Sequence, residues 1–232
     1  MKVRKKRKML GRRRYALTLL VCLLAVELLT ALFNNRNQTI FQAQRDLEIY
    51  RGWPKTQVIW EEKLGTSWND RTRLRLHVLD GGVALVEYEW NVVEGWYPQV
   101  FAAVETREGW PIQARFMTSN DYCKVYVIGY PTDPTMDLDR VTFGLCHWED
   151  GQGFVVDPED RITIAPEDRI YHEGKTYFVC EFDLSQRLTE EEKEQFGTLF
   201  TSVLVHVTDE NGQAIQWEDG WADDFGEWMC IG

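Results

Sequence analysis

Several patterns that identify common enzyme classes are missing from this sequence. The four His (His77, His147, His172 and His206) form no H-E-x-x-H motif, and the Cys form no C-x-x-C motif. Residues 34–232 hold only four Ser, none of them within G-x-S-x-G. These motifs belong to zinc proteases, structural zinc sites and serine hydrolases. The sequence therefore assigns no catalytic residue, no metal ligand and no cofactor.

Positive charge is scarce beyond the first 14 residues. Nine of the 26 Lys and Arg precede Tyr15, and Glu27 is the only acidic residue before position 34. The net charge of −11 for the whole chain therefore becomes about −19 for residues 34–232. A surface of this charge repels nucleic acid, so a nucleic-acid partner is excluded.

The first 33 residues have the pattern of a membrane anchor. A basic run over residues 2–14 precedes an apolar stretch, Tyr15 to Phe33, that contains a single charge. A helix of that length is roughly 28 Å long, close to the hydrocarbon thickness of a bilayer. Residues 30–34 offer no A-x-A-like cleavage site, which favours an uncleaved signal anchor over a cleaved signal peptide.

The same charges set the orientation of the chain. Positive charge before the span keeps the N-terminus in the cytoplasm. We expect a single-pass protein of the cell membrane, with the lipid bilayer as one partner and a β domain outside the cytoplasm. Its expected segments are a basic tail (1–14), a transmembrane signal anchor (15–33), a juxtamembrane stalk (34–54) and an extracytoplasmic domain (55–232).

Glu27 lies inside the predicted span, where a carboxylate is costly. Thr30, Ala31 and Asn34 share its helical face by their spacing. A small and polar stripe of this kind packs well against a second membrane helix, so Glu27 is a candidate contact for a membrane partner. The alternative is that its side chain reaches outward to the membrane surface and has no role.

The outer part of the chain has the pattern of β structure. All ten Trp lie there, and short alternating runs follow one another with turn signals between them. Residues 73–78 alternate with Leu74, Leu76 and Val78 inward, and the turn at 80–82 leads into a partner strand, which predicts a hairpin. His77 points outward on this pattern and is expected on the surface.

The predicted fold is mainly β. It is an antiparallel β-sandwich, built as one large unit or as two tandem Ig-like or jelly-roll-like units. An internal boundary is expected at 131–139, and one short helix near 189–200, where Thr189 and Glu192 form a capping box. Further strands are expected at 57–63, 99–105, 112–118, 122–130, 140–148, 161–165, 175–184 and 202–208.

Four Cys lie outside the predicted membrane segment: Cys123, Cys146, Cys180 and Cys230. An even number in an oxidising compartment permits two disulfides, whose pairing the sequence does not determine. Unpaired thiols in the core are the equal alternative.

The C-terminal segment mixes aromatic side chains with carboxylates. Trp217, Trp221 and Trp228 could stack on sugar rings, while Asp223 and Asp224 accept hydrogen bonds from sugar hydroxyls. These five residues are the candidate binding site of the outer domain. The competing interpretation is that the Trp side chains fill the core.

A short basic tail, one span and an external β domain also resemble the arrangement of sortases, the cysteine transpeptidases of bacterial cell walls. The resemblance implies a His, a reactive Cys at a strand end and an Arg on a nearby strand. Cys180 and Arg187 are the matching Cys and Arg, and no His has a matching context. The run 176–180 departs from the T-L-x-T-C pattern at most positions, and Cys180 alternates with Phe178 and Phe182 as a core residue does.

Together these features predict a membrane-anchored, extracytoplasmic binding module rather than an enzyme. Its expected partner is another envelope protein or a surface glycan. The alternative is a membrane-tethered envelope enzyme, either a glycoside hydrolase or a sortase-like cysteine transpeptidase.

Overall fold

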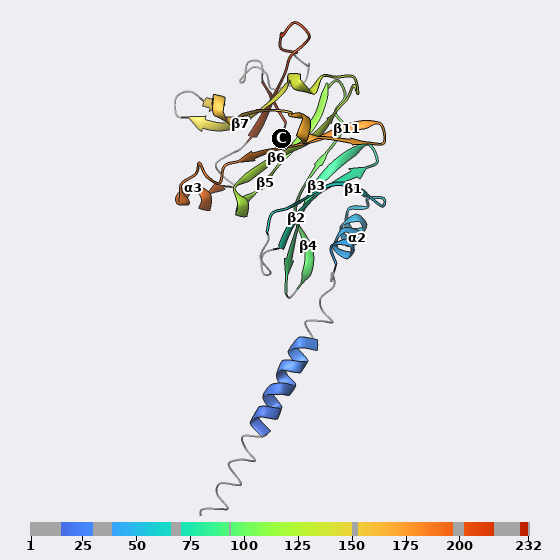
Figure 1. Cartoon of the computed structure of the whole chain (residues 1–232), viewed down its shortest axis with the longest axis vertical. Helices are drawn as coiled ribbons and strands as arrows, with labels where there is room; N and C mark the ends of the chain where they lie inside the picture. Colours follow the sequence, from blue (N-terminus) through green and yellow to red (C-terminus); the bar gives the residue numbers. More distant parts are fainter. Residues whose placement is uncertain are drawn as a thin grey trace, which may run out of the picture.

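The structure of the chain, a computed structural model, is mainly β, as predicted. The model describes residues 15–29, 39–65, 71–92, 94–149, 153–196, 202–215 and 228–231. Within these residues the strands form three antiparallel sheets (Figure 1).

The first sheet is an antiparallel meander in the order β1-β2-β3-β4. Its strands are β1 (Gln57–Lys63), β2 (Arg71–Leu79), β3 (Gly82–Asn91) and β4 (Gly95–Val104). The hairpin predicted from the alternation is confirmed as β2 and β3, with Leu76 opposite Leu85 and a tight turn at 80–81. We call this the first sheet throughout.

The middle sheet has the order β10-β11-β6-β5. Its strands are β5 (Ile112–Ser119), β6 (Lys124–Pro131), β10 (Arg169–His172) and β11 (Lys175–Asp183). The third sheet has the order β13-β12-β7-β8, and β9 also pairs with β7. Its strands are β7 (Val141–Glu149), β8 (Gly153–Val155), β9 (Arg161–Thr163), β12 (Ser202–Val207) and β13 (Met229–Cys230).

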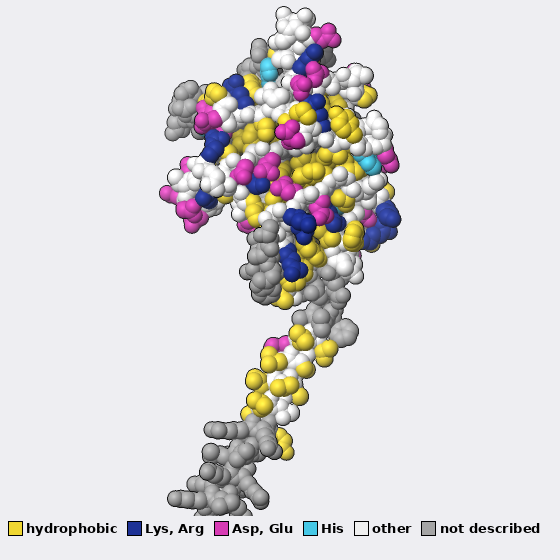
Figure 2. All heavy atoms as spheres, viewed as in Figure 1, with side chains coloured by type: hydrophobic (Ala, Val, Ile, Leu, Met, Phe, Trp, Pro, Cys, Tyr) yellow, Lys and Arg dark blue, Asp and Glu magenta, His cyan; other side chains and the backbone are white. Residues whose placement is uncertain are grey.

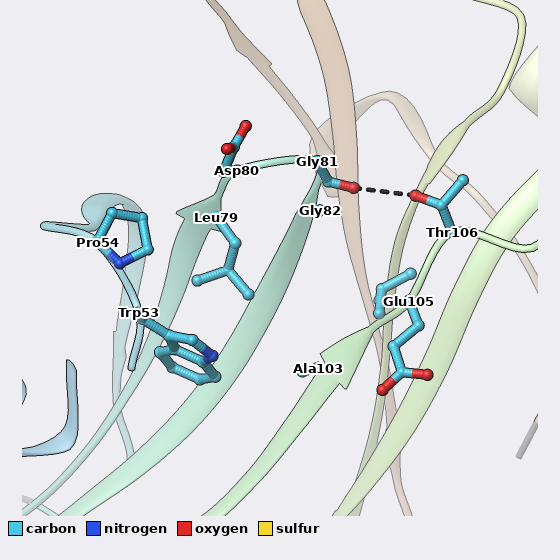
Figure 3. Close-up of a pocket in the computed structure, with 10 residues that line it drawn as sticks. Trp53, Pro54, Leu79, Asp80, Gly81, Gly82, Ala103, Glu105 and Thr106 are labelled. Atoms are coloured by element: carbon cyan, nitrogen blue, oxygen red, sulfur yellow. Dashed lines mark hydrogen bonds between the residues drawn. The ribbon is translucent and has the colours of Figure 1, made fainter. Parts of the chain in front are cut away.

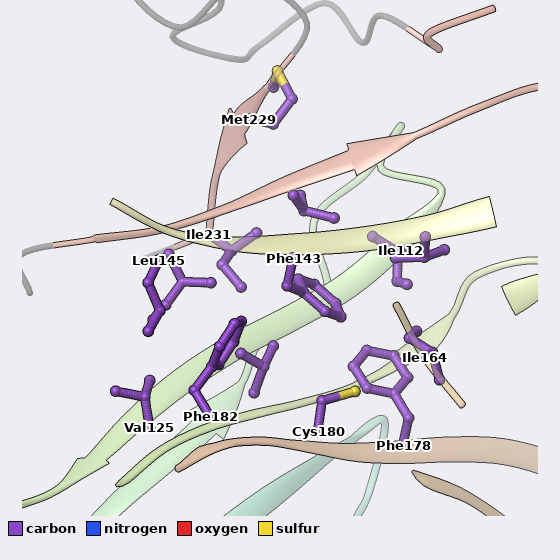
Figure 4. Close-up of a cluster of buried hydrophobic side chains, with 14 of the residues drawn as sticks. Ile112, Val125, Phe143, Leu145, Ile164, Phe178, Cys180, Phe182, Met229 and Ile231 are labelled. Carbon is purple, nitrogen blue, oxygen red and sulfur yellow. The ribbon is translucent and has the colours of Figure 1, made fainter. Parts of the chain in front are cut away.

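Both faces of β6, which lies between β11 and β5 in the middle sheet, are buried. Val125 and Val127 of β6 belong to a hydrophobic cluster shared with Phe143 of the third sheet. Figure 4 shows part of this cluster. Tyr126 and Ile128, which alternate with those valines, belong to a second cluster shared with the first sheet. Because successive strand residues point to opposite faces, β6 packs against both neighbouring sheets.

A helix covers the outer face of the first sheet, and it was not predicted from the sequence. This helix, α2 (Ile40–Arg51), lies within the segment expected to be a stalk. Thr39 and Gln42 form a capping box at its start, and Gly52 ends it in the left-handed conformation. Ala43 and Leu47 pack on Val86 and Tyr88 of β3, so this part of the expected stalk is folded onto the domain.

The short helix predicted near 189–200 is confirmed in its first turns. α3 (Glu190–Glu194) begins at the Thr189 and Glu192 capping box, and Phe196 after it is buried in the core. Residues 197–200 lie outside the described residues. The remaining short elements are 3₁₀ helices: η1 (Asn120–Tyr122), η2 (Leu138–Arg140), η3 (Pro158–Asp160) and η4 (Pro166–Asp168).

The segment 131–139, expected to divide two units, connects β6 to β7. Side chains from both sides of it, such as Val125 and Phe143, share one hydrophobic cluster. The β6 and β7 layers therefore depend on each other for burial.

The cysteines of the described residues are free thiols. Cys123, Cys146 and Cys180 are buried, and Cys230 is half-buried. Of the two alternatives left open by the sequence, the structure therefore has unpaired thiols, three of them in the interior.

Residues 15–29 form a helix with exposed apolar side chains, seen as a run of hydrophobic groups in Figure 2. Within the part of the chain that the structure describes, no helix combines the length and the apolar character needed to cross a membrane. Residues 30–33 of the predicted span lie outside that part. The membrane span over 15–33 therefore stays a prediction.

The close packing of the middle sheet makes Gly129 of β6 sensitive to substitution. A Cβ at this position would overlap the carbonyl oxygen of Gln113 and lie 2.6 Å from Cζ of Phe178. We expect Gly129→Ala to lower the free energy of unfolding by about 1–3 kcal/mol, the usual cost of overpacking. Chemical denaturation followed by Trp fluorescence measures this change.

The control is Arg115→Ala, an exposed position on the neighbouring strand β5. It is expected to change the free energy by less than about 0.5 kcal/mol. Equal stability of Gly129→Ala and the wild type would contradict this packing.

Candidate functional site

A buried polar network joins α2 to the outer face of the first sheet. The Thr56 hydroxyl lies 2.7 Å from Oε1 of Glu48 and 2.9 Å from Nδ1 of His77. The Thr56 backbone N–H donates to the same Glu48 oxygen at 2.8 Å. Glu48 is 2% exposed and His77 1%, so His77 is not the surface residue predicted from strand alternation, because α2 covers that face.

The direction of the hydrogen bonds follows from the ionised carboxylate. Burial by itself would raise the pKa of Glu48, but the hydrogen bonds from Thr56, Arg45 and Gln44 outweigh it and lower the pKa to about 2. An ionised Glu48 only accepts, so the Thr56 hydroxyl donates to it and accepts from Nδ1–H of His77. Nε2 of His77 then accepts from the Tyr88 hydroxyl at 3.3 Å.

His77 is neutral in this network. Burial and the positive charge of Arg75 lower the pKa of His77 to about 4, against a smaller opposing effect of Glu48. The network as a whole is satisfied internally, which is the condition for keeping polar groups buried without loss of stability. The network holds α2 on the first sheet.

The network reaches the surface at a hollow beside α2. Arg75 pairs with Glu61 at 2.7 Å, and its guanidinium lies 5.1 Å from the centre of the Phe41 ring. Phe41, Gln44, Lys55, Thr56, Gln57 and Val58 line a hollow of about 620 Å³. Thr56 therefore links the buried network to this hollow.

A second pocket, the Trp53 pocket, lies beyond the C-terminal end of α2. It has a volume of about 440 Å³. It is lined by Trp53, Pro54, Leu79, Asp80, Gly81, Gly82, Ala103, Val104, Glu105 and Thr106. Figure 3 shows the Trp53 indole beside Leu79, with the carboxylates of Asp80 and Glu105 extending at opposite edges.

The walls of the Trp53 pocket are held by neighbouring contacts. The Trp53 ring packs edge-on against Phe101, with ring centres 6.1 Å apart. On the opposite side the Thr106 hydroxyl lies 3.0 Å from the Gly81 carbonyl oxygen, which also accepts from the Tyr130 hydroxyl at 3.0 Å. The pocket therefore has one aromatic wall and two carboxylates at its rim, and these contacts hold its walls in position.

Of the C-terminal aromatic and acidic residues predicted to bind a ligand, the structure places Trp228. Its ring lies over Gly144 of β7, 5.4 Å from the His206 ring centre and 5.4 Å from the Arg161 guanidinium. Trp228 is half-buried and packs on the third sheet. Trp217, Trp221, Asp223 and Asp224 lie outside the described residues.

Glu27, the predicted membrane contact, is exposed on the helix over residues 15–29. Its expected neighbours Thr30, Ala31 and Asn34 lie outside the described residues. The partner-helix role of Glu27 therefore stays a prediction.

Cys180, the residue that resembles a sortase nucleophile, is fully buried in the core beside Phe178 and Phe182. Burial raises the pKa of its thiol well above the ordinary value, which opposes formation of the nucleophilic thiolate. Arg187 pairs instead with Asp160 at 2.6 Å and Glu159 at 3.2 Å.

One group of side chains among the described residues has the spacing of metal ligands: His147, Asp157 and Asp160. One ligand atom of each lies within 4.8 Å of the others. The sequence did not predict this group, because its members are ten and three positions apart and match no metal motif.

No protein-family model matches this chain, and neither the curated proteins nor the solved structures contain a significant match to it.

The sequence did contain a signal for α2 and hence for the network beneath it. Thr39 and Gln42 are a capping-box pair, and Gly52 is a helix-ending residue at the right distance. With that helix predicted, the outward-facing His77 and Arg75 would have been candidates for burial.

The pKa of His77 predicts how stability depends on pH. The unfolded chain protonates His77 below pH 6.5, whereas the folded chain does so only near pH 4. The unfolded state therefore binds more protons in this interval, and the free energy of unfolding falls as the pH is lowered from 6.5 to 4. The loss from His77 is roughly 3 kcal/mol at most.

Urea denaturation of the full chain in detergent, repeated across this pH range, measures the loss. His77→Gln is expected to be less stable at pH 7 and to lack this part of the pH dependence. His172→Gln is the control and keeps it. An unchanged pH profile in His77→Gln would show that His77 is not buried neutral.

Proposed function

We propose that this protein is a single-pass, membrane-anchored binding module of the cell envelope, with an extracytoplasmic β-sandwich domain that binds a surface glycan. The basic run and the apolar stretch at the N-terminus support the anchor. The strongly negative outer part supports a ligand other than nucleic acid or anionic lipid.

The observation that carries the binding role is the Trp53 pocket. Aromatic side chains supply a large apolar face, on which the C–H face of a sugar ring can stack. Carboxylates at the rim accept hydrogen bonds from hydroxyl groups. Trp53 with Asp80 and Glu105 combines these two features in a concave site whose walls are already in place, which is typical of small-ligand sites.

Binding is favoured over cleavage for this pocket. Glycoside hydrolysis requires one carboxyl group kept protonated by an apolar or buried setting. Asp80 and Glu105 are both exposed to solvent. The transpeptidase alternative requires an accessible thiolate, and Cys180 is buried in the core.

Substitution of Trp53 tests the glycan proposal. The full-length protein in lipid nanodiscs is applied to an array of envelope glycans, and the affinity for the best glycan is then measured by calorimetry. Trp53→Ala is expected to weaken binding at least tenfold, about 1.4 kcal/mol, because it removes the stacking face.

The matched control is Tyr171→Ala, which removes an exposed aromatic ring from β10 of the middle sheet. It is expected to bind as the wild type does. Binding that survives Trp53→Ala, or an array without any bound glycan, would reject the glycan role of this pocket.

A second envelope protein remains part of the proposal through the membrane segment. Substitution Glu27→Leu is expected to reduce recovery of a crosslinked membrane partner, because a carboxylate in the bilayer is kept at a cost that a partner helix offsets. Crosslinking in native membranes followed by mass spectrometry measures the recovery.

Ala25→Leu is the control, since a residue two positions away lies on the opposite side of the helix. It is expected to leave recovery unchanged. Equal recovery from wild type and Glu27→Leu would show that Glu27 does not contact a partner.

A further inference from the structure

His147, Asp157 and Asp160 converge at one end of the third sheet. His147 lies near the end of β7, Asp157 follows β8, and Asp160 ends η3 directly before β9. Because β7 pairs with β8 on one stretch and with β9 on another, the backbone ladder fixes both ends of the 156–160 connection. The connection is therefore held beside His147.

The distances within this triad are those of side chains that face a common point without bonding each other. Nε2 of His147 and Oδ2 of Asp157 are 3.9 Å apart, too far for a hydrogen bond. Two ligands bound at about 2.1 Å to one metal ion are about 3–4 Å apart. The triad, with all ligand atoms within 4.8 Å, needs only a small closing movement, and Asp157 is half exposed and free to make it.

Asp160 is a pre-positioned member of the triad. It is 5% exposed, and Nη1 of Arg187 donates to its Oδ1 at 2.6 Å. A hydrogen bond from a neighbouring side chain orients a metal-binding carboxylate, and the contact from Arg187 to Oδ1 leaves Oδ2 available. Asp160 is thus held rigidly at the inner end of the triad.

The charges around the triad favour a cation. Asp157, Glu159 and Asp160 bring three negative charges, and Arg187, paired with Asp160 and Glu159, balances one of them. Arg161 forms no ion pair with these carboxylates, and its guanidinium donates to the Val156 carbonyl oxygen and lies over the Trp228 ring. The two carboxylates of the triad, of which only Asp160 is paired with an Arg, are the electrostatic setting that a divalent ion neutralises.

We propose that His147, Asp157 and Asp160 bind a divalent first-row transition metal ion. The one imidazole nitrogen distinguishes the triad from an all-oxygen site, which would prefer Ca²⁺ or Mg²⁺. Zn²⁺ and Mn²⁺ accept this mixture of nitrogen and carboxylate ligands. Three protein ligands leave further coordination positions open to water. This site is independent of the Trp53 pocket.

The test uses the full-length protein in detergent after treatment with a chelator. Zn²⁺ binding is measured by calorimetry, and Co²⁺ is added as a spectroscopic probe whose visible absorption reports nitrogen and oxygen coordination. One ion per chain is expected, together with a rise in melting temperature. Asp157→Asn and His147→Gln are each expected to raise the dissociation constant at least tenfold.

Asp133→Asn is the matched control, since Asp133 is an exposed carboxylate that accepts from Thr135 in a separate turn. It is expected to bind metal as the wild type does. Asp157→Asn changes a half-exposed side chain and is expected to fold, which a circular dichroism melt in the absence of metal verifies. No stoichiometric binding, or binding that Asp157→Asn and Asp133→Asn affect equally, would overturn the proposal.

Discussion

The layers of this protein depend on β6, a strand of the middle sheet that is buried on both faces. Five consecutive residues of β6, Val125 to Gly129, are buried, and their side chains alternate between two hydrophobic clusters. In a strand with one polar face, a register slip of one residue exposes apolar groups and is penalised. Both faces of β6 are apolar, so its register must be specified by the fit between neighbouring side chains. The Phe178 ring against Gly129 is one such contact.

The middle sheet covers only one face of the first sheet, and α2 covers the other. The first sheet buries Leu74, Leu76 and Leu85 against the middle sheet, which turns His77 and Tyr88 to the other side. Those polar groups are acceptable only because α2 brings Glu48 and the adjoining segment brings Thr56 to satisfy them. Trp53 follows the cap of α2 directly, so the same docking places the aromatic wall of the Trp53 pocket.

Much of the fold was predictable because its information is local. Alternation identified the β2–β3 hairpin, and a capping box identified the start of α3. Alternation does not show which helix or sheet covers each face of a strand. His77 was expected on the surface, and Glu87 of β3 carries a carboxylate that alternation places opposite Val86 and Tyr88. Both are buried, because α2 lies over one face of the first sheet and the middle sheet over the other. The His147, Asp157 and Asp160 group depends likewise on strand pairings between separate segments.

The docking of α2 also fixes how far the domain can stand from its proposed anchor. With residues 40–51 folded onto the first sheet, only residues 34–39 connect the predicted span to the domain. Six residues reach about 20 Å at full extension, whereas the 21 residues of a free stalk over 34–54 would reach about 70 Å. In the proposed arrangement the domain is therefore a short-range module, and a ligand must approach to within about one domain length of the bilayer to meet it.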